Sequence, residues 1–215
     1  MSESSLIVNK IAEIGASLYR KGMIAGTDGN ISARINSTEI LITASGKAKG
    51  ALTEQDMVTV NLQGNVISSS GKPSSEVNMH LHLYNKRDDI KACVHAHPPY
   101  TTAFAVAGVP LNEHILPEVA LFVGDIAFTE FAFPGTNEVA ESLDKYIQTH
   151  DAFVLKNHGL VTVGRSLTEA FHRQEIVEHF ARILFLARQI GSVDQLSECD
   201  LKRLRQMRKE FIQDK

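Results

Sequence analysis

The 215-residue sequence predicts an α/β fold in a single domain. Strand-like runs alternate with helix-like segments along the chain, and a hairpin signal in the first half indicates that the sheet is at least partly antiparallel. No segment repeats at a fixed period, which favours packed layers over a solenoid. A chain of this length can bury one well-formed core, and it is short for two.

The first half of the chain predicts one helix and four strands. Leu6, Ile11, Ile14 and Leu18 recur at helical spacing, so an amphipathic helix is expected to about Lys21. The strand-like runs that follow are Ile31–Ile35, Ile40–Thr43, Met57–Leu62 and Val66–Ser69. Between the last two, Gln63-Gly64-Asn65 predicts a hairpin turn.

The second half predicts further helices and three more strands. Ser75 and Glu76 open a helix through Arg87, a strand covers Lys91 to His97, and Pro98-Pro99 starts a short helix. Thr136 can cap a helix through Ile147. The remaining predicted elements are the strand pair Ala152–Lys156 and Leu160–Val163, a long helix from about Leu167 to Gln189, and a basic amphipathic helix at the C-terminal end.

Composition excludes several classes of protein. The formal net charge is -3 and no basic stripe is present, so a nucleic-acid partner is not expected. No apolar run approaches the ~20 residues of a membrane span, and the first residues lack a signal-peptide core, so we expect a cytoplasmic protein. Cys93 lies in an apolar strand and Cys199 in a polar tail, which predicts a core residue and no disulfide.

Three histidines form the most informative pattern. His95 and His97 lie two residues apart in a predicted strand, so both point to the same face. His158 ends another apolar run and precedes Gly159, which allows a tight turn. A lone His-x-His is more often an ordinary surface pair. Three imidazoles with a fourth position open are typical of a catalytic zinc site.

Three polar loops have the composition of anion-binding segments: Gly26–Ser32, Thr43–Lys47 and Ser70–Glu76. Their glycines, serines, threonine and asparagine offer N–H groups and hydroxyls, and adjacent Ser74 and Ser75 stand at a predicted helix N-terminus, which suits a phosphate. Each loop alone is more simply an ordinary turn or helix cap. Three such loops beside a metal triad favour a phosphorylated substrate.

Glu76 is the carboxylate expected to do chemistry. It follows the two serines, so it can lie between a phosphate and a metal and move a proton on carbon. Its simpler interpretation is a first-turn Glu that complements the helix dipole. His80 and His82 on the same helix are expected to pack against the sheet.

Taken together, these motifs resemble the class II aldolase/adducin family, and within it the branch that cleaves L-fuculose 1-phosphate. The resemblance covers about Lys10 to Gln189. It implies a central, mostly antiparallel sheet with helices on both faces, and a homotetramer with active sites between subunits. It also implies a metal site of His95, His97 and His158 holding zinc, or manganese or another divalent metal, with Glu76 as acid/base and additional ligand. The phosphate would be held by residues of the three loops, namely Thr27, Gly29, Asn30, Ser45, Gly46, Ser74 and Ser75.

The activity that this resemblance implies is reversible cleavage of a deoxy-ketose 1-phosphate into dihydroxyacetone phosphate and a small aldehyde. Family aldolases have a Tyr that handles the proton on the aldehyde oxygen, and an ungapped comparison puts Leu116 there. Tyr100, His114 and Glu118 are the nearest substitutes in sequence. An apolar Leu116 favours 5-deoxyribulose 1-phosphate, which releases acetaldehyde, at least as much as fuculose 1-phosphate, which releases lactaldehyde.

Three different functions remain open. A methylthioribulose-1-phosphate dehydratase would share the metal triad but eliminate water. A pentulose-5-phosphate 4-epimerase is less favoured, because that branch prefers Asp where Glu76 stands. A non-enzymatic, adducin-like structural module would lack a complete triad.

Overall fold

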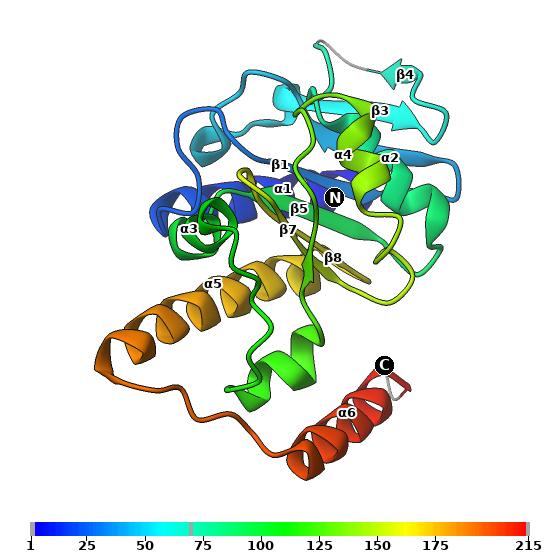
Figure 1. Cartoon of the computed structure of the whole chain (residues 1–215). Helices are drawn as coiled ribbons and strands as arrows, with labels where there is room; N and C mark the ends of the chain where they lie inside the picture. The colour runs from blue at the N-terminus through cyan, green and yellow to red at the C-terminus, as the bar shows by residue number, and fades with distance from the viewer. Residues whose placement is uncertain (1–2, 69–70, 214–215) are drawn as a thin grey trace.

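The computed structural model describes residues 3–68 and 71–213, and its centre is one eight-stranded sheet (Figure 1). The strand order is β4-β3-β2-β1-β5-β8-β7-β6. Among the described strands, only β6 and β7 pair in parallel, so the expected mostly antiparallel sheet is confirmed. The strands are β1 Asn30–Arg34, β2 Glu39–Thr43, β3 Met57–Asn61, β4 Val66–Ser68, β5 Ala92–Ala96, β6 Ala127–Phe128, β7 Ala152–Leu155 and β8 Gly159–Gly164.

Helices cover both faces of this sheet, as expected. They are α1 Glu3–Arg20, α2 Val77–Lys86, α3 Pro99–Ala107, α4 Asn137–Ser142, α5 Leu167–Ile190 and α6 Glu198–Gln213. Three short helical turns complete the set: η1 Lys49–Ala51, η2 Glu54–Asp56 and the π-helical η3 Val119–Val123.

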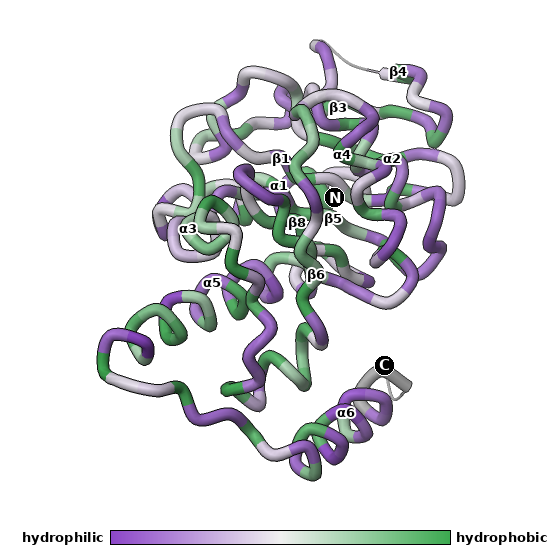
Figure 2. Tube along the Cα trace, viewed as in Figure 1, coloured by the Kyte–Doolittle hydropathy of each residue, from purple (hydrophilic) through white to green (hydrophobic). Residues whose placement is uncertain are grey.

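The period-two alternation of the strands divides the core into two sides. Cys93 of β5 packs on the side covered by α2 and α4, with Met79 and Leu143. Its neighbour Val94 faces the opposite side, against Ile14 of α1. Helices α3 and α5 and the turn η3 complete that second side over β7 and β8. Figure 2 shows the resulting hydrophobic centre and the more polar outer segments.

The predicted β3–β4 hairpin is present. Gly64 has a φ of 90°, and the side chain of Asn61 accepts hydrogen bonds from the backbone N–H groups of Gln63 and Asn65. The last residue of the predicted fourth strand, Ser69, lies outside the described residues, as does Ser70 of the third polar loop.

Two parts of the second half differ from expectation. The helix predicted through Ile147 ends at Ser142, because the chain then continues in turns such as Tyr146 N–H to the Leu143 carbonyl, three residues back. Strand β6 and the turn η3 were not predicted, since β6 has two residues and η3 five, too few to show a period.

The predicted C-terminal helix is α6, which follows an extended segment from Gly191 to Ser197 and lies apart from the sheet (Figure 1). Its Arg208 donates to the Leu121 carbonyl of η3 and to Asp151, and Leu201 is buried. In the described part of the chain, no helix combines the length and apolar character needed to cross a membrane.

Four neighbouring strands bring their ends to one edge of the sheet. Because β2, β1, β5 and β8 alternate in direction, the start of β1 lies beside the end of β5, where Asn30 pairs with His95. The end of β5 in turn meets the start of β8, where Ala96 pairs with Leu160. All three predicted histidines lie at this edge.

Candidate metal centre and phosphate loops

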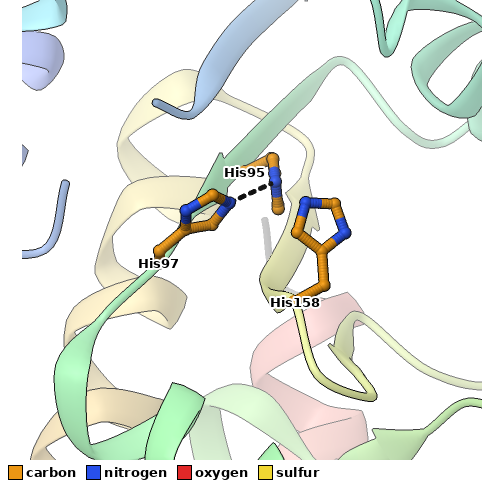
Figure 3. A group of neighbouring side chains, drawn as sticks. All are labelled: His95, His97 and His158. Atoms are coloured by element: carbon orange, nitrogen blue, oxygen red, sulfur yellow. Dashed lines mark hydrogen bonds between the residues drawn. The ribbon is translucent and has the colours of Figure 1, made fainter. Parts of the chain in front are cut away.

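The structure brings the three predicted histidines together (Figure 3). His95 is in β5, His97 directly follows that strand, and His158 directly precedes β8. The Nε2 atoms of His95 and His97 are 3.1 Å apart, and one candidate ligand atom from each of the three rings lies within 4.8 Å of the others. Residues that are 61 positions apart therefore face one point.

Gly159 is needed here for close approach. The left-handed residue of the β7–β8 turn is Asn157, with a φ of 57°, and not Gly159 as the expected tight turn would suggest. A Cβ atom on residue 159 would lie 2.5 Å from the Ala96 carbonyl oxygen and 2.6 Å from Cδ2 of His97. Glycine therefore lets the His158 turn lie against the end of β5.

Hydrogen bonding and burial prepare His95 as a metal ligand. Its Nδ1 donates to the Leu160 carbonyl at 3.0 Å, which leaves the lone pair of Nε2 facing the cluster. The side chain is fully buried, and this burial lowers the pKa of His95 to about 3. Burial also lowers the pKa of His158. Neutral imidazole is the form that binds metals.

Glu76 joins this cluster from the N-terminal end of α2. Its Oε2 lies 3.3 Å from Nε2 of His95, and its Oε1 lies 3.4 Å from Nε2 of His158. Oε1 is buried and has no hydrogen-bond partner among the described residues. Burial acts to raise the pKa of Glu76, but charge on His95 and His158 and a hydrogen bond from Asn30 lower it to about 2. The rings act this way only while protonated, whereas the Asn30 bond acts at every pH.

This donor set fits a divalent cation. Ligand atoms bound tetrahedrally at about 2.0–2.1 Å from zinc lie ~3.3 Å from each other. Three pairs of donor atoms come close to this spacing: 3.1 Å between His95 and His97, 3.3 Å between His95 and Oε2 of Glu76, and 3.4 Å between His158 and Oε1 of Glu76. The ligand atoms of the three histidines all lie within 4.8 Å of one another, so a bound cation would draw them slightly closer. A cation would also satisfy Oε1 of Glu76, which has no hydrogen-bond partner among the described residues.

The three polar loops meet beside this cluster. Ser45 N–H donates to the Lys72 carbonyl at 3.0 Å and Ser74 N–H to the Thr43 carbonyl at 3.1 Å, so the second and third loops lie side by side. The first loop reaches Glu76 through Asn30, whose Nδ2 donates to Oε2 at 2.8 Å.

The predicted phosphate residues fall into two groups. Thr27, Ser45, Gly46 and Ser75 are exposed at the loop surfaces and Gly29 is partly exposed. Ser74 and Asn30 are buried and already bonded: Ser74 Oγ accepts from the N–H of Glu76, and the side-chain amide of Asn30 donates to Glu76. Ser74 therefore stabilises the turn that leads into α2, whose N-cap is Glu76, in addition to any role toward a ligand.

A buried lysine in the same region was not predicted. Lys49 is 3% exposed. Its Nζ donates to the carbonyls of Thr27 at 2.6 Å and Lys47 at 2.7 Å, so it connects the first polar loop to the second. Burial lowers the pKa of Lys49, while Asp28 and Glu76 act to raise it. Its neighbour Lys47, which lies in the predicted loop, is exposed and pairs with Asp56.

Lys49 carries no local sequence signal that marks it as buried. Gly15 of α1 is the residue that permits its position, because a Cβ there would lie 2.3 Å from the Lys49 carbonyl oxygen. Asp28 was also missed: its carboxylate lies 3.5 Å from Nδ1 of His97.

The remaining residues singled out in the sequence lie in other surroundings. His80 is buried and hydrogen-bonded within α2 and β1, and His82 bonds to Asp144. Leu116 packs against the core cluster of α3, α5 and η3. The ring of Tyr100 lies against Phe185 and Arg182 of α5. Cys93 is buried, and neither cysteine forms a disulfide.

Comparison with known proteins gives a consistent family. The model of the class II aldolase and adducin N-terminal domain matches residues 9–185. An L-fuculose phosphate aldolase of Methanococcus maripaludis is 36% identical over 174 residues, which are 81% of this chain and 93% of that protein. A 3-oxo-tetronate 4-phosphate decarboxylase of Haemophilus influenzae is 32% identical over 198 residues, 90% of this chain and 93% of its own.

Solved structures agree. An L-fuculose 1-phosphate aldolase superposes with a TM-score of 0.89 at 31% identity, over 97% of this chain and 98% of that one. A putative aldolase/epimerase/decarboxylase from Escherichia coli superposes with a TM-score of 0.86 at 29% identity, over 93% of this chain and 97% of that one.

Proposed function

The chain belongs to the class II aldolase and adducin family, and from this we propose that it is a metal-dependent lyase that breaks a carbon–carbon bond of a deoxy-ketose 1-phosphate. The products would be dihydroxyacetone phosphate and a small aldehyde, lactaldehyde or acetaldehyde. The observation that carries this proposal is the arrangement of Glu76 with His95, His97 and His158 at ligand spacing, next to three linked polar loops.

His95, His97 and His158 would hold the metal, for which zinc is the first choice, with Glu76 as a further ligand when no substrate is bound. The bound ion would act as a Lewis acid for the negative charge that develops on the substrate oxygens when the bond breaks. Phosphate would bind at the loops through Thr27, Gly29, Asn30, Ser45, Gly46, Ser74 and Ser75. Lys49, which bonds to the first and second of these loops, would add positive charge next to the phosphate.

Glu76 would perform the proton transfer on carbon. After the C3–C4 bond breaks, C3 of the donor half must gain a proton to give dihydroxyacetone phosphate, and in synthesis it must lose that proton. Oε1 of Glu76 suits this step because Oε2 accepts the Asn30 hydrogen bond, while Oε1 has no hydrogen-bond partner among the residues that the structure describes.

A second candidate is decarboxylation of a 3-oxo-tetronate 4-phosphate, the reaction named for the Haemophilus relative. Loss of CO2 from C1 of that substrate leaves the same three-carbon fragment, which takes a proton on carbon and becomes dihydroxyacetone phosphate. CO2 departs without a proton, whereas cleavage to an aldehyde requires a base for the hydroxyl proton. Leu116 stands where the resemblance expects such a group, and this is the observation that supports decarboxylation as the second candidate.

Dehydration, epimerisation and a purely structural role have less support. A structural module does not require three clustered histidines with a buried carboxylate beside them. Dehydration or epimerisation would leave the carbon skeleton intact, so product analysis separates both from either lyase. The homotetramer with sites between subunits, the cytoplasmic location and the single-domain organisation remain predictions.

One assay decides between the two lyases. The metal-loaded protein should be incubated with L-fuculose 1-phosphate, 5-deoxyribulose 1-phosphate and 3-oxo-tetronate 4-phosphate, and dihydroxyacetone phosphate, aldehyde and CO2 measured on one preparation. An aldolase is expected to give aldehyde, with kcat/KM for 5-deoxyribulose 1-phosphate at least comparable to that for fuculose 1-phosphate. CO2 without aldehyde would establish the decarboxylase, and no dihydroxyacetone phosphate from any of the three would contradict both.

A further inference from the structure

A buried chain of hydrogen bonds leads away from Glu76 into the sheet. Asn30 Nδ2 donates to Glu76 Oε2 at 2.8 Å, and Asn30 Oδ1 lies 2.5 Å from Nε2 of His80. On its other side, Nδ1 of His80 lies 2.6 Å from the hydroxyl of Ser32, which is 2.8 Å from the hydroxyl of Tyr84. These hydrogen bonds therefore join α2 to β1 at two residues of the strand, Asn30 and Ser32.

The protons of this chain have one consistent order. An ionised carboxylate only accepts hydrogen bonds, so the NH2 group of Asn30 must face Glu76 and its carbonyl must face His80. His80 then donates from Nε2, which leaves Nδ1 to accept from Ser32. Ser32 in turn accepts from Tyr84. Every donor along the chain points toward Glu76.

Water cannot reach these side chains to replace a hydrogen-bond donor that is lost. Asn30 is 3% exposed, and Ser32, His80 and Tyr84 are fully buried. If one side chain of such a network is lost, its former partner is left as a buried polar group without a hydrogen bond. That partner then reorients according to the hydrogen bonds that it keeps. Burial also lowers the pKa of His80 to about 4, consistent with a neutral ring that donates from one nitrogen and accepts at the other.

We propose that His80 is a positioning residue for Glu76. Its Nε2–H fixes the amide of Asn30, and the amide holds Oε2 of Glu76, so that Oε1 is the oxygen presented to a cation and to the substrate carbon. The inference rests on the proposed role of Glu76 and adds a residue that has no contact with the histidine triad in the described structure. Without such a role, the chain would serve only to attach α2 to β1.

Two matched substitutions separate these roles. In His80→Gln the side-chain amide nitrogen can occupy the Nε2 position and still donate to Asn30. In His80→Asn the shorter amide can reach Ser32 but cannot reach Asn30. Both are neutral, polar and smaller than histidine, so both should lower Tm, and a purely structural role predicts similar effects on every other measurement.

The positioning role predicts that His80→Asn weakens zinc binding, measured by competition with a chelator, about tenfold or more, because a hydrogen bond that orients a charged ligand is lost. Exchange of the dihydroxyacetone phosphate C3 proton with deuterated water should slow by a similar factor. His80→Gln should stay within about threefold of wild type in both. Equal losses in the two folded variants, or zinc binding by His80→Asn within threefold of wild type, would overturn the proposal.

A spectroscopic measurement is independent of turnover. Nitrogen-15 NMR of the wild-type imidazoles should show His80 as the Nε2–H tautomer, and the Nδ1–H tautomer would overturn the proposed order of donors. If Glu76→Gln leaves proton exchange unchanged, the proposed function of Glu76 fails. The tautomer and the zinc affinities would still report on the His80–Asn30 contact.

Discussion

Gly159 and His97 approach so closely that residue 159 has no room for a side chain. The added Cβ atom would lie 2.6 Å from Cδ2 of the ring and 2.5 Å from the carbonyl oxygen of Ala96, which belongs to the backbone and cannot rotate away. Gly159→Ala should therefore displace His97 and weaken metal binding about 10–100-fold, a loss typical of disturbed ligand support. Isothermal titration with zinc measures this. Gly191→Ala is the control, because a Cβ there meets nothing within 4 Å; equal affinities in the two variants would contradict the steric argument.

The metal itself can be tested ligand by ligand. His95→Ala, His97→Ala and His158→Ala should each reduce bound metal per subunit, determined by elemental analysis, about tenfold or more while the fold persists. Chelation should abolish activity, and zinc or manganese should restore it. The exposed His172 provides the matched control, and His172→Ala should keep full metal content. Full activity of metal-free His95→Ala would refute the site.

Glu76→Gln distinguishes a helix cap from a proton carrier. A cap alone predicts a loss of about 1 kcal/mol of stability or less and nearly intact turnover. A proton carrier predicts that turnover drops by ~100-fold or more with metal content retained. Exchange of the dihydroxyacetone phosphate C3 proton with deuterated water isolates the step, and exchange at the wild-type rate would remove Glu76 from the mechanism.

Lys49→Met should weaken phosphate binding. The substitution removes a buried charge and leaves the carbonyls of Thr27 and Lys47 without their donor, which costs about 1–3 kcal/mol of stability for each unsatisfied group. We expect inorganic phosphate to bind about tenfold less tightly by titration calorimetry. Lys91→Met is the control, since Lys91 also donates to a carbonyl, that of Asp88, on an exposed surface. Unchanged phosphate affinity in folded Lys49→Met would restrict Lys49 to a structural role.

Asp56 should contribute a pH-dependent part of the stability. Hydrogen bonds from Lys47 and Thr53 lower the pKa of Asp56 to about 2. Because the folded-state pKa is below the unfolded value, the contribution is complete above about pH 4 and is lost as the pH falls toward about 2. The difference in urea unfolding free energy between wild type and Asp56→Asn should be constant from pH 5 to 7 and shrink below about pH 4. A difference that does not change with pH would show that the carboxylate charge contributes nothing.

The sequence predicted the parts of the fold and site whose signal is local. His95 and His97 are two residues apart in a strand, so their common face follows from the period of the strand. The β3–β4 hairpin follows from its turn residues, and α1 from its apolar spacing. The helix expected through Ile147 was too long, because backbone bonds over three residues replace helical ones after Ser142.

What the sequence missed depends on contacts between distant segments. Lys49 is buried because Gly15 lets α1 approach η1. His80 was expected only to pack, and its role in the buried chain depends on Asn30, 50 residues away. Neither contact is marked in the sequence by a periodic pattern or a motif, and both form only once the sheet and its helices have assembled.

The histidine triad also has a consequence for folding. His95 and His158 approach each other only after β5 and β8 have paired, so the unfolded chain cannot offer the same set of ligands. An ion that binds the folded form alone shifts the unfolding equilibrium by mass action, by about 4 kcal/mol at a free concentration of 1,000 times its Kd. The thermal stability of this protein would then depend on how much free metal surrounds it, and starvation for that metal would expose the chain to unfolding as well as stop its chemistry.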